Sequence, residues 1–191
     1  MNNLMNPKYP EGRNLFQDKN ILITAAAGSG IGFSTAKRFL EEGANIFISD
    51  VHQGRLDEAI DGLRKLDMGE VNGCLCNVTK DEEIETMFKK AISCYSNLNG
   101  VINNAGLGGE SALEDMTNDA WDLVMDVTHN GAMKIMRAAI PVLKDTQGVI
   151  VNNASVLGWR AQAGQSHYAA AKAGVMALTR CVALELSLIH I

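Results

Sequence analysis

The sequence predicts an α/β fold in which helices cover both faces of a doubly wound parallel sheet. Two observations indicate it: short apolar runs alternate with longer amphipathic segments, and a glycine-rich turn follows the first apolar run. Such alternation is typical of parallel strands joined by right-handed helical crossovers. With 47% hydrophobic residues among 191, the chain can form one large core. We expect one domain at residues 18–191, after a loose polar arm at residues 1–17.

The first strand is expected at residues 21–23, an aliphatic run of the kind that a strand buried on both faces requires. Gly28, Gly30 and Gly32 follow, and residues 33–42 have the pattern of an amphipathic helix that a glycine ends. Glycines let the backbone approach a phosphate at a helix N-terminus. The segment therefore predicts a Rossmann-type dinucleotide loop, with an ordinary glycine turn as the alternative.

The second strand, expected at residues 45–50, ends in Asp50. A carboxylate at this position of a dinucleotide-binding fold accepts hydrogen bonds from the adenosine ribose and repels a 2′-phosphate. We therefore expect NAD as the cofactor, with NADP less favoured, although Arg55 could offset part of the repulsion. Asp50 is also suited to cap a helix at residues 53–66, and the two roles are compatible.

The later elements continue the alternation. Three further short runs are expected as strands, at residues 71–76, 100–103 and 149–153. Three further segments are expected as helices, at residues 81–95, 118–143 and 166–186. The middle one of these helices would run unbroken through Gly131 and Pro141.

Ser155, Tyr168 and Lys172 form the candidate catalytic set. Tyr168 and Lys172 are one turn apart on an expected helix, so they would share one face. An ammonium held beside a phenol favours the phenolate, which allows a tyrosine to act as a base. Ser155 precedes the helix and could supply a hydroxyl to the same reacting oxygen. Alone, the Tyr-x-x-x-Lys pair is a weak signal, because surface helices carry it by chance.

In this order the segments resemble the short-chain dehydrogenase/reductase family, of the single-domain type, over about residues 18–186. The loop from Thr24 to Gly32 is similar to the family's cofactor loop, and Asn103-Asn-Ala-Gly106 matches its signature after the fourth strand. The resemblance implies an NAD(P)-dependent oxidoreductase that transfers hydride between nicotinamide and a secondary alcohol or ketone.

The resemblance also implies roles for single residues. Tyr168 would be the general acid/base, Lys172 would assist it and bind the nicotinamide ribose, and Ser155 would polarise the substrate oxygen. The implied cofactor-binding residues are Thr24, Gly28, Ser29, Gly30, Ile31, Gly32, Asp50, Asn77, Val78, Asn104, Ala105, Gly106, Tyr168 and Lys172.

Three departures from the family pattern bear on the site. The tripeptide Ala25-Ala26-Ala27 follows Thr24 where a glycine is usual, and alanine suits that position if its φ stays negative. Asn77 stands where an aspartate often meets adenine, and an amide there can still donate and accept. Thr128 stands where an asparagine usually completes a catalytic proton relay, so the relay either runs through Thr128 and water or is lost.

The alanine loop, Thr128 and the stretch 152–162 are similar to a bacterial subgroup of the family. That subgroup includes a dehydrogenase of steroid C/D-ring breakdown that acts on a hydroxy-indanone propanoyl-CoA thioester. Trp159, Arg160 and Gln162 lie between Ser155 and Tyr168, where a substrate wall is expected. Trp159 could stack on an apolar ring and Arg160 could meet a carboxylate or phosphate, or both could simply pack and solvate a loop.

Other function classes stay open. The alternatives are a 3-oxoacyl-thioester reductase, an inactive or regulatory NAD-binding chain, and a sugar-nucleotide epimerase or dehydratase. A net charge of −5 offers no basic patch for nucleic acid, and no run of ~18 apolar residues exists to span a membrane. The four cysteines lack metal-ligand spacing, so we expect no metal. Buried free thiols and the missing signal-peptide pattern favour the cytoplasm.

Family members continue past the final helix with two more strands, a segment near the nicotinamide and a substrate lid. Here the chain stops after residues 187–191, so the resemblance implies a C-terminally truncated sheet whose own activity is open. It also implies that a full-length parent forms a homodimer or homotetramer through its last two helices.

Overall fold

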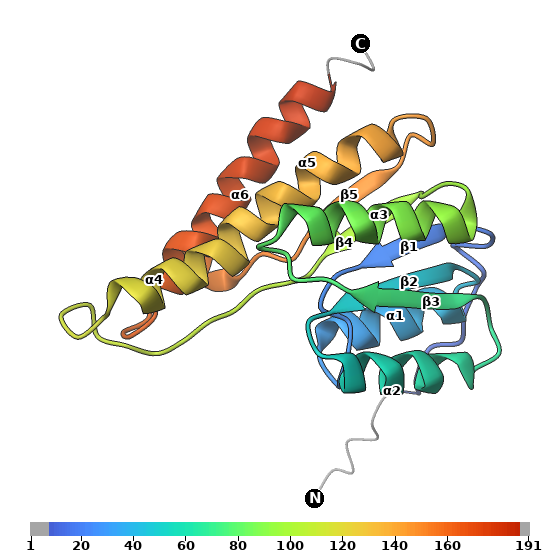
Figure 1. Cartoon of the computed structure of the whole chain (residues 1–191), viewed down its shortest axis with the longest axis horizontal. Coiled ribbons are helices and arrows are strands. Elements are labelled where there is room, and N and C mark those ends of the chain that lie inside the picture. Colours follow the sequence, from blue (N-terminus) through green and yellow to red (C-terminus); the bar gives the residue numbers. More distant parts are fainter. Residues whose placement is uncertain (1–7, 188–191) are drawn as a thin grey trace, which may run out of the picture.

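The protein, described by a computed structural model over residues 8–187, is a parallel sheet with helices on both faces (Figure 1). The strands are β1 (Asn20–Ile23), β2 (Asn45–Asp50), β3 (Val71–Leu75), β4 (Gly100–Asn103) and β5 (Val149–Asn152). The helices are α1 (Ile31–Glu41), α2 (Gln53–Arg64), α3 (Asp81–Tyr95), α4 (Asn118–Met125), α5 (Gly131–Leu143) and α6 (Ser166–Ser187). A π-helical turn η1 (Asp126–Asn130) joins α4 to α5, and a 3₁₀ turn η2 (Val156–Gly158) precedes α6. The doubly wound parallel sheet expected from the sequence is confirmed.

The strand order is β3-β2-β1-β4-β5, and all neighbours are parallel. Because β2 and β4 lie on opposite sides of β1, the winding reverses between β1 and β4. Ile21 pairs with Ile46 of β2 on one side and with Gly100 of β4 on the other, which sets the register of the central strands. Such a reversal leaves a crevice at the carboxyl ends of the strands, where ligands of open α/β sheets bind.

Each face of the sheet has its own core. Ile21 and Ile23 enter the core beneath α1 and α2, whereas Leu22 enters the core beneath α3 and α5. Successive side chains of a strand point to opposite faces. A strand buried on both faces therefore needs an uninterrupted apolar run, which is the pattern that β1 shows.

The long helix expected at residues 118–143 is wrong in one respect, because η1 interrupts it. Thr117 caps α4 by accepting from the Ala120 amide at 3.2 Å, and α5 carries Pro141 without ending there. π-Helical turns inside α-helices often occur at functional sites, since the extra residue redirects a side chain. Here η1 contains Thr128, which is completely buried.

Residues 8–17, expected as part of a loose arm, are attached to α1 instead. The Glu42 carboxylate accepts the amides of Arg13 at 2.7 Å and Leu15 at 3.2 Å, and it pairs with Arg38. These backbone hydrogen bonds, with Arg38, hold the pKa of Glu42 below its ordinary value. The polar composition of this segment gives no sign of these contacts, because they depend on Glu42 at the end of α1. Residues 1–7 and 188–191 lie outside the described residues.

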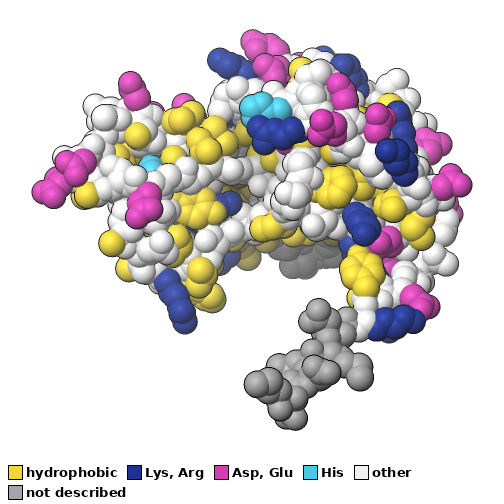
Figure 2. Space-filling view, turned by 90° about the horizontal axis from the view of Figure 1, so that it is seen from below, with side chains coloured by type: hydrophobic (Ala, Val, Ile, Leu, Met, Phe, Trp, Pro, Cys, Tyr) yellow, Lys and Arg dark blue, Asp and Glu magenta, His cyan; other side chains and the backbone are white. Residues whose placement is uncertain are grey.

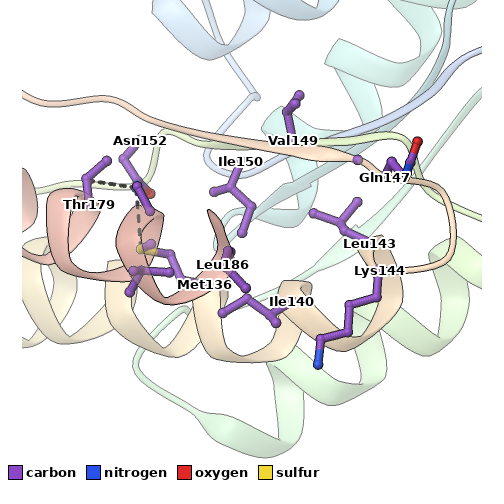
Figure 3. Close-up of a pocket in the computed structure, with 13 residues that line it drawn as sticks. Met136, Ile140, Leu143, Lys144, Gln147, Val149, Ile150, Asn152, Thr179 and Leu186 are labelled. Atoms are coloured by element: carbon purple, nitrogen blue, oxygen red, sulfur yellow. Dashed lines mark hydrogen bonds between the residues drawn. The ribbon is translucent and has the colours of Figure 1, made fainter. Parts of the chain in front are cut away.

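An apolar groove of about 390 Å³ lies between α5, β5 and α6 (Figure 3). The Asn152 amide crosses one end of it and donates to Thr179 Oγ1 at 2.9 Å, with Met136 Sδ at 3.4 Å (Figure 3). This contact ties β5 to α6. The groove shares no lining residue with the cleft described below and is lined mainly by aliphatic side chains.

On the face seen in Figure 2, acidic and basic side chains are interspersed. Within residues 8–187, no helix combines the length and the hydropathy needed to cross a bilayer.

Candidate active site

A cleft of about 770 Å³ opens beside the carboxyl ends of β1 and β4, where the winding of the sheet reverses. Three loops and the start of α6 line it: Ala25, Gly30, Ile31, Asn104, Gly106, Gly108, Gly109, Glu110, Asn153, Gln165, Tyr168 and Lys172. The cleft therefore brings together the glycine loop, the segment after β4 and the Tyr168–Lys172 pair, as the sequence predicts.

The glycine loop is fastened to the segment after β4 through Thr24 and Asn104. Thr24 Oγ1 accepts the amides of Asn104 and Ala105, each at 3.0 Å. The Asn104 side chain donates to the carbonyls of Thr24 and Ala25, at 3.1 and 3.0 Å, and accepts from Asn153 at 2.9 Å. The side-chain amide of Asn104 thus holds three loops in register at the edge of the cleft that this residue lines.

The backbone of the glycine loop differs from the expectation at Ala25. Its φ is +50°, in the left-handed region, whereas the sequence argument required a negative φ. This conformation turns the Ala25 carbonyl toward Asn104 and packs it on Gly32, where an added Cβ would lie 2.5 Å from that carbonyl oxygen. The close packing of Gly32 overrides the preference of alanine, at a cost of roughly 1–2 kcal/mol.

The N-terminus of α1 has the properties of an anion site. Gly30 caps the helix without a side-chain hydrogen bond, and the first turn contains no acidic residue. An added Cβ at Gly30 would meet nothing within 4 Å, so this position opens onto free space, while Gly28 needs its φ of +82°. Unsatisfied amides and the helix dipole favour a phosphate at such a point. The residues present therefore fit the pyrophosphate of a dinucleotide.

Asp50 is fixed at the end of β2 by backbone amides. One carboxylate oxygen accepts from Val51 at 2.8 Å and His52 at 3.2 Å, and the other accepts from Ala27 at 3.3 Å. The N-cap residue of α2 is His52, and its side chain makes no capping hydrogen bond. Asp50 accepts the backbone amide of His52 itself and no amide of the first helical turn, so it is not the N-cap of α2. The Ala27 contact joins Asp50 directly to the glycine loop, and the carboxylate remains half exposed.

Asn77 and Val78 are less available to a cofactor than the sequence indicates. Asn77 Oδ1 accepts from the Thr79 amide and hydroxyl at 3.0 and 2.9 Å, which is a local turn. Val78 is 5% exposed and packs against Gly131, where an added Cβ would lie 2.7 Å from it. Of these two residues, the side-chain Nδ2 of Asn77 and the backbone of Val78 are the groups left to meet a ligand, since the Asn77 backbone amide donates to Glu83 at 2.7 Å.

Tyr168 and Lys172 lie on one face of α6, as expected. The Lys172 ammonium is 5.7 Å from the centroid of the Tyr168 ring and donates to the Asn153 carbonyl at 2.6 Å. Burial lowers the pKa of Lys172, which is 4% exposed. An ammonium held in a dry site acts strongly on a neighbouring phenol, because the local dielectric screens it weakly.

Ser155 stands at the start of η2, where its Oγ accepts the Leu157 amide at 3.2 Å. It is half-buried and is not among the residues that line the cleft. Its turn packs on α6, because an added Cβ at Gly158 would meet Met176 Sδ at 2.6 Å and backbone at Lys172 and Ala173 at 3.3 Å. The serine is therefore held beside the helix of the other two residues, with its hydroxyl proton uncommitted.

Thr128 uses its hydroxyl on the loop after β4. Its Oγ1 accepts the Leu107 amide at 2.8 Å and donates to the Leu107 carbonyl at 2.7 Å. The single hydroxyl proton is thus engaged, so this geometry favours a positioning role for Thr128 over a proton relay through it, which was one of the two alternatives that the sequence left open. Asn130 does not replace it, since its amide donates to Asp126 at 2.7 Å.

The three residues that the sequence suggested as a substrate wall do not line the cleft. Trp159 is 78% exposed, Arg160 and Gln162 are exposed as well, and none of them lines the cleft. Glu110 and Gln165 line it instead, and the sequence argument missed both. The neighbouring pair Gly108-Gly109 was the available signal, because consecutive glycines mark a close approach of backbone to another group.

Two of the expected buried thiols are exposed. Cys74 and Cys76 are buried, whereas Cys94 and Cys181 reach the surface. Burial raises the pKa of the Cys76 thiol to about 12. In the described part of the chain, no group of histidine, cysteine and carboxylate side chains is arranged to hold a metal ion.

Residues 19–191 match the sequence model described as short chain dehydrogenase. Over 187 residues the chain is 49% identical to the (5R,7aS)-5-hydroxy-7a-methyl-1-oxo-2,3,5,6,7,7a-hexahydro-1H-indene-carboxyl-CoA reductase of Mycobacterium tuberculosis, covering 97% of this chain and 71% of that protein. It is 35% identical to a 3-oxoacyl-acyl-carrier-protein reductase of Thermotoga maritima, covering 90% and 69%.

Solved structures show the same arrangement. A short chain dehydrogenase from Mycobacterium smegmatis superposes with a TM-score of 0.91 at 50% identity, covering 94% of this chain and 75% of that one. A xylitol dehydrogenase with bound NAD+ superposes with a TM-score of 0.87 at 28% identity, covering 91% and 66%.

Proposed function

Because the chain belongs to the short-chain dehydrogenase family, and is an oxidoreductase by that membership, we propose that it transfers hydride between NAD and a cyclic secondary alcohol or ketone carried as a CoA thioester. The observation that carries the proposal is the placement of Tyr168 and Lys172 in one cleft with the bare backbone of the glycine loop. Two parts of the proposed substrate, its ring and its CoA thioester, rest on the substrate in the name of the M. tuberculosis relative.

In the proposed mechanism, Tyr168 exchanges a proton with the substrate oxygen. Its hydroxyl has no hydrogen-bond partner among residues 8–187, so it is free to meet a ligand. Lys172, fixed by Asn153, stabilises the phenolate that forms when the tyrosine gives up its proton. Ser155 keeps a free hydroxyl proton for the same substrate oxygen. The nicotinamide ring supplies the hydride chemistry when the dinucleotide is bound.

We further propose NAD rather than NADP as the cofactor. The carboxylate of Asp50 is joined to the glycine loop at Ala27, and an acid at the end of the second strand is what dinucleotide-binding folds use to meet the adenosine ribose. A 2′-phosphate there would meet a negative charge, and like charges at close range are unfavourable. The anion site at the start of α1 supports the pyrophosphate of either dinucleotide.

The test is the substitution Tyr168→Phe, which removes only the hydroxyl. Turnover of a cyclic hydroxyacyl thioester, followed by the absorbance of the reduced cofactor, should fall about 10²–10⁴-fold. Binding of NAD, measured by calorimetry, should stay within about twofold of the unmodified protein. Full activity in the Phe variant would refute the mechanism.

A second candidate is reduction of a linear 3-oxoacyl thioester, which the T. maritima relative favours. The two candidates are separated by comparing kcat/KM for a cyclic and a linear substrate that carry the same thioester. A preference for the linear substrate would assign the second activity.

A further inference from the structure

Glu110 and Gln165 line the cleft next to Tyr168, yet the proposed mechanism uses neither. Both come from segments that pack against the start of α6. They therefore lie in the part of the cleft beside Tyr168, the residue that the proposed function places at the reacting oxygen.

A strap of residues 108–111 holds Glu110 in this position. An added Cβ at Gly108 would lie 3.5 Å from Tyr168 Cδ2, and one at Gly109 would lie 3.0 Å from His167 Nε2. The bare backbone of the strap thus lies directly on the first turn of α6. The Ser111 amide completes the attachment by donating to the Gly164 carbonyl at 3.0 Å.

Glu110 is an exposed residue whose stem lies against Gly164 and whose carboxylate is free. Its Cγ lies 2.9 Å from the Cβ position of Gly164, whose φ of +75° also suits glycine. The carboxylate has no hydrogen-bond or ion-pair partner among residues 8–187. Of the cleft-lining residues, Glu110 is the one anion and Lys172 the one cation, and the Lys172 ammonium is committed to Asn153.

We propose that Glu110 selects substrates whose acyl group is uncharged. Its carboxylate repels a free carboxylate placed beyond the reacting carbon, and it accepts a hydrogen bond from an N–H donor such as an amide of a thioester's pantetheine arm. Gln165 beside it can donate to the thioester carbonyl. This inference rests on the proposed function and deepens it: the substrate is an esterified acid and not the free acid.

The experiment compares two ligands that differ in one charge, the 4-oxocyclohexanecarboxylate anion and its methyl ester. Dissociation constants for both are measured by calorimetry with NADH-bound protein, for the unmodified chain, for Glu110→Gln and for Glu114→Gln. Glu114 is the matched control, because it is an exposed acid of the same loop, as Glu110 is, but does not line the cleft.

The unmodified protein should bind the ester about tenfold more tightly than the anion. Glu110→Gln should reduce that ratio at least about fivefold by tightening binding of the anion, whereas Glu114→Gln should leave it unchanged. An unchanged ratio in Glu110→Gln, or an equal drop in the control, would overturn the role of Glu110.

Turnover separates this inference from the function on which it rests. NADH-dependent reduction of the bound ester is followed in the same samples. An ester that binds but is not reduced would count against the proposed function, and the binding ratio would still decide the role of Glu110. A protein that binds neither ligand would overturn both.

Discussion

The hydroxyl of Thr128 and the backbone of Leu107 are hydrogen-bonded in both directions, with the Leu107 amide at 2.8 Å and its carbonyl at 2.7 Å. The contact fixes the loop after β4 at Leu107, the residue that precedes the strap and follows Gly106, which lies beside Lys172. An added Cβ at Gly106 would lie 3.3 Å from the Lys172 ammonium and 3.8 Å from Thr128, so the loop has little room to shift.

Thr128→Val keeps the shape of the side chain and removes the hydroxyl. Both polar groups of Leu107 would lose a partner, so the free energy of unfolding should fall by about 1–3 kcal/mol. Denaturant titration measures this, and KM should rise because the cleft loop is released. Thr128→Ser, which retains the hydroxyl, is the control and should recover most of both losses. Equal effects in the two variants would contradict the role given to the hydroxyl.

Ala25→Gly should stabilise the protein. The φ of +50° at Ala25 costs an alanine roughly 1–2 kcal/mol, and glycine avoids that cost while losing about 0.5–1 kcal/mol through the entropy of the unfolded chain. We expect a net gain of about 0–1.5 kcal/mol in urea denaturation. Ala27→Gly, in the same loop but without a positive φ, should instead be destabilising. A loss of stability in Ala25→Gly would show that the loop is unstrained.

Asp50→Asn should shift the cofactor preference toward NADP. Asparagine keeps an oxygen for the amides of Val51 and His52 and removes the charge that opposes a 2′-phosphate. The ratio of kcat/KM for NAD to that for NADP should fall about tenfold, equivalent to about 1.4 kcal/mol. Asp57→Asn removes an equal charge from the exposed surface of α2 and should leave the ratio unchanged. Should both variants alter the ratio alike, Asp50 would have no specific part in it.

Alkaline pH should destabilise the fold through Cys76. Burial raises the pKa of this thiol from its ordinary 9.0 to about 12, so the folded chain retains a proton that the unfolded chain loses. The contribution is therefore complete below pH 9 and is lost as the pH rises toward 12. Urea denaturation at a series of pH values should show this slope, and Cys76→Ala should flatten it. Cys94→Ala changes an exposed thiol and should not.

Much of the fold follows from local sequence. The aliphatic run of β1 and the periodic apolar positions of α1 are signals that each segment carries alone. The break in the helix at η1 could not be read in this way, because Thr128 is drawn to Leu107, a tertiary contact that no local propensity encodes. The same holds for the positive φ of Ala25, which depends on how closely Gly32 packs beneath it.

The site residues also differ in whether local sequence or a tertiary contact brings them to the cleft. Tyr168 and Lys172 were found because helical spacing makes them neighbours, and the structure places them together in the cleft. Glu110 reaches that cleft only through the strap, whose path depends on contacts with His167 and Gly164. Trp159 carries a strong sequence signal for substrate stacking, yet it points into solvent in the described chain, since residue type alone does not set direction.

The hydrogen bond between Thr24 and Asn104 joins residues that are 80 positions apart, and this separation affects how the chain is made. A ribosome adds about 5–20 residues per second, so β1 waits on the order of 4–16 s before β4 is synthesised. During that time β1 can pair with β2, but its other edge stays unpaired and open to wrong partners. A ligand of this cleft can stabilise only chains that have passed β4, and the earlier half must reach its shape unaided.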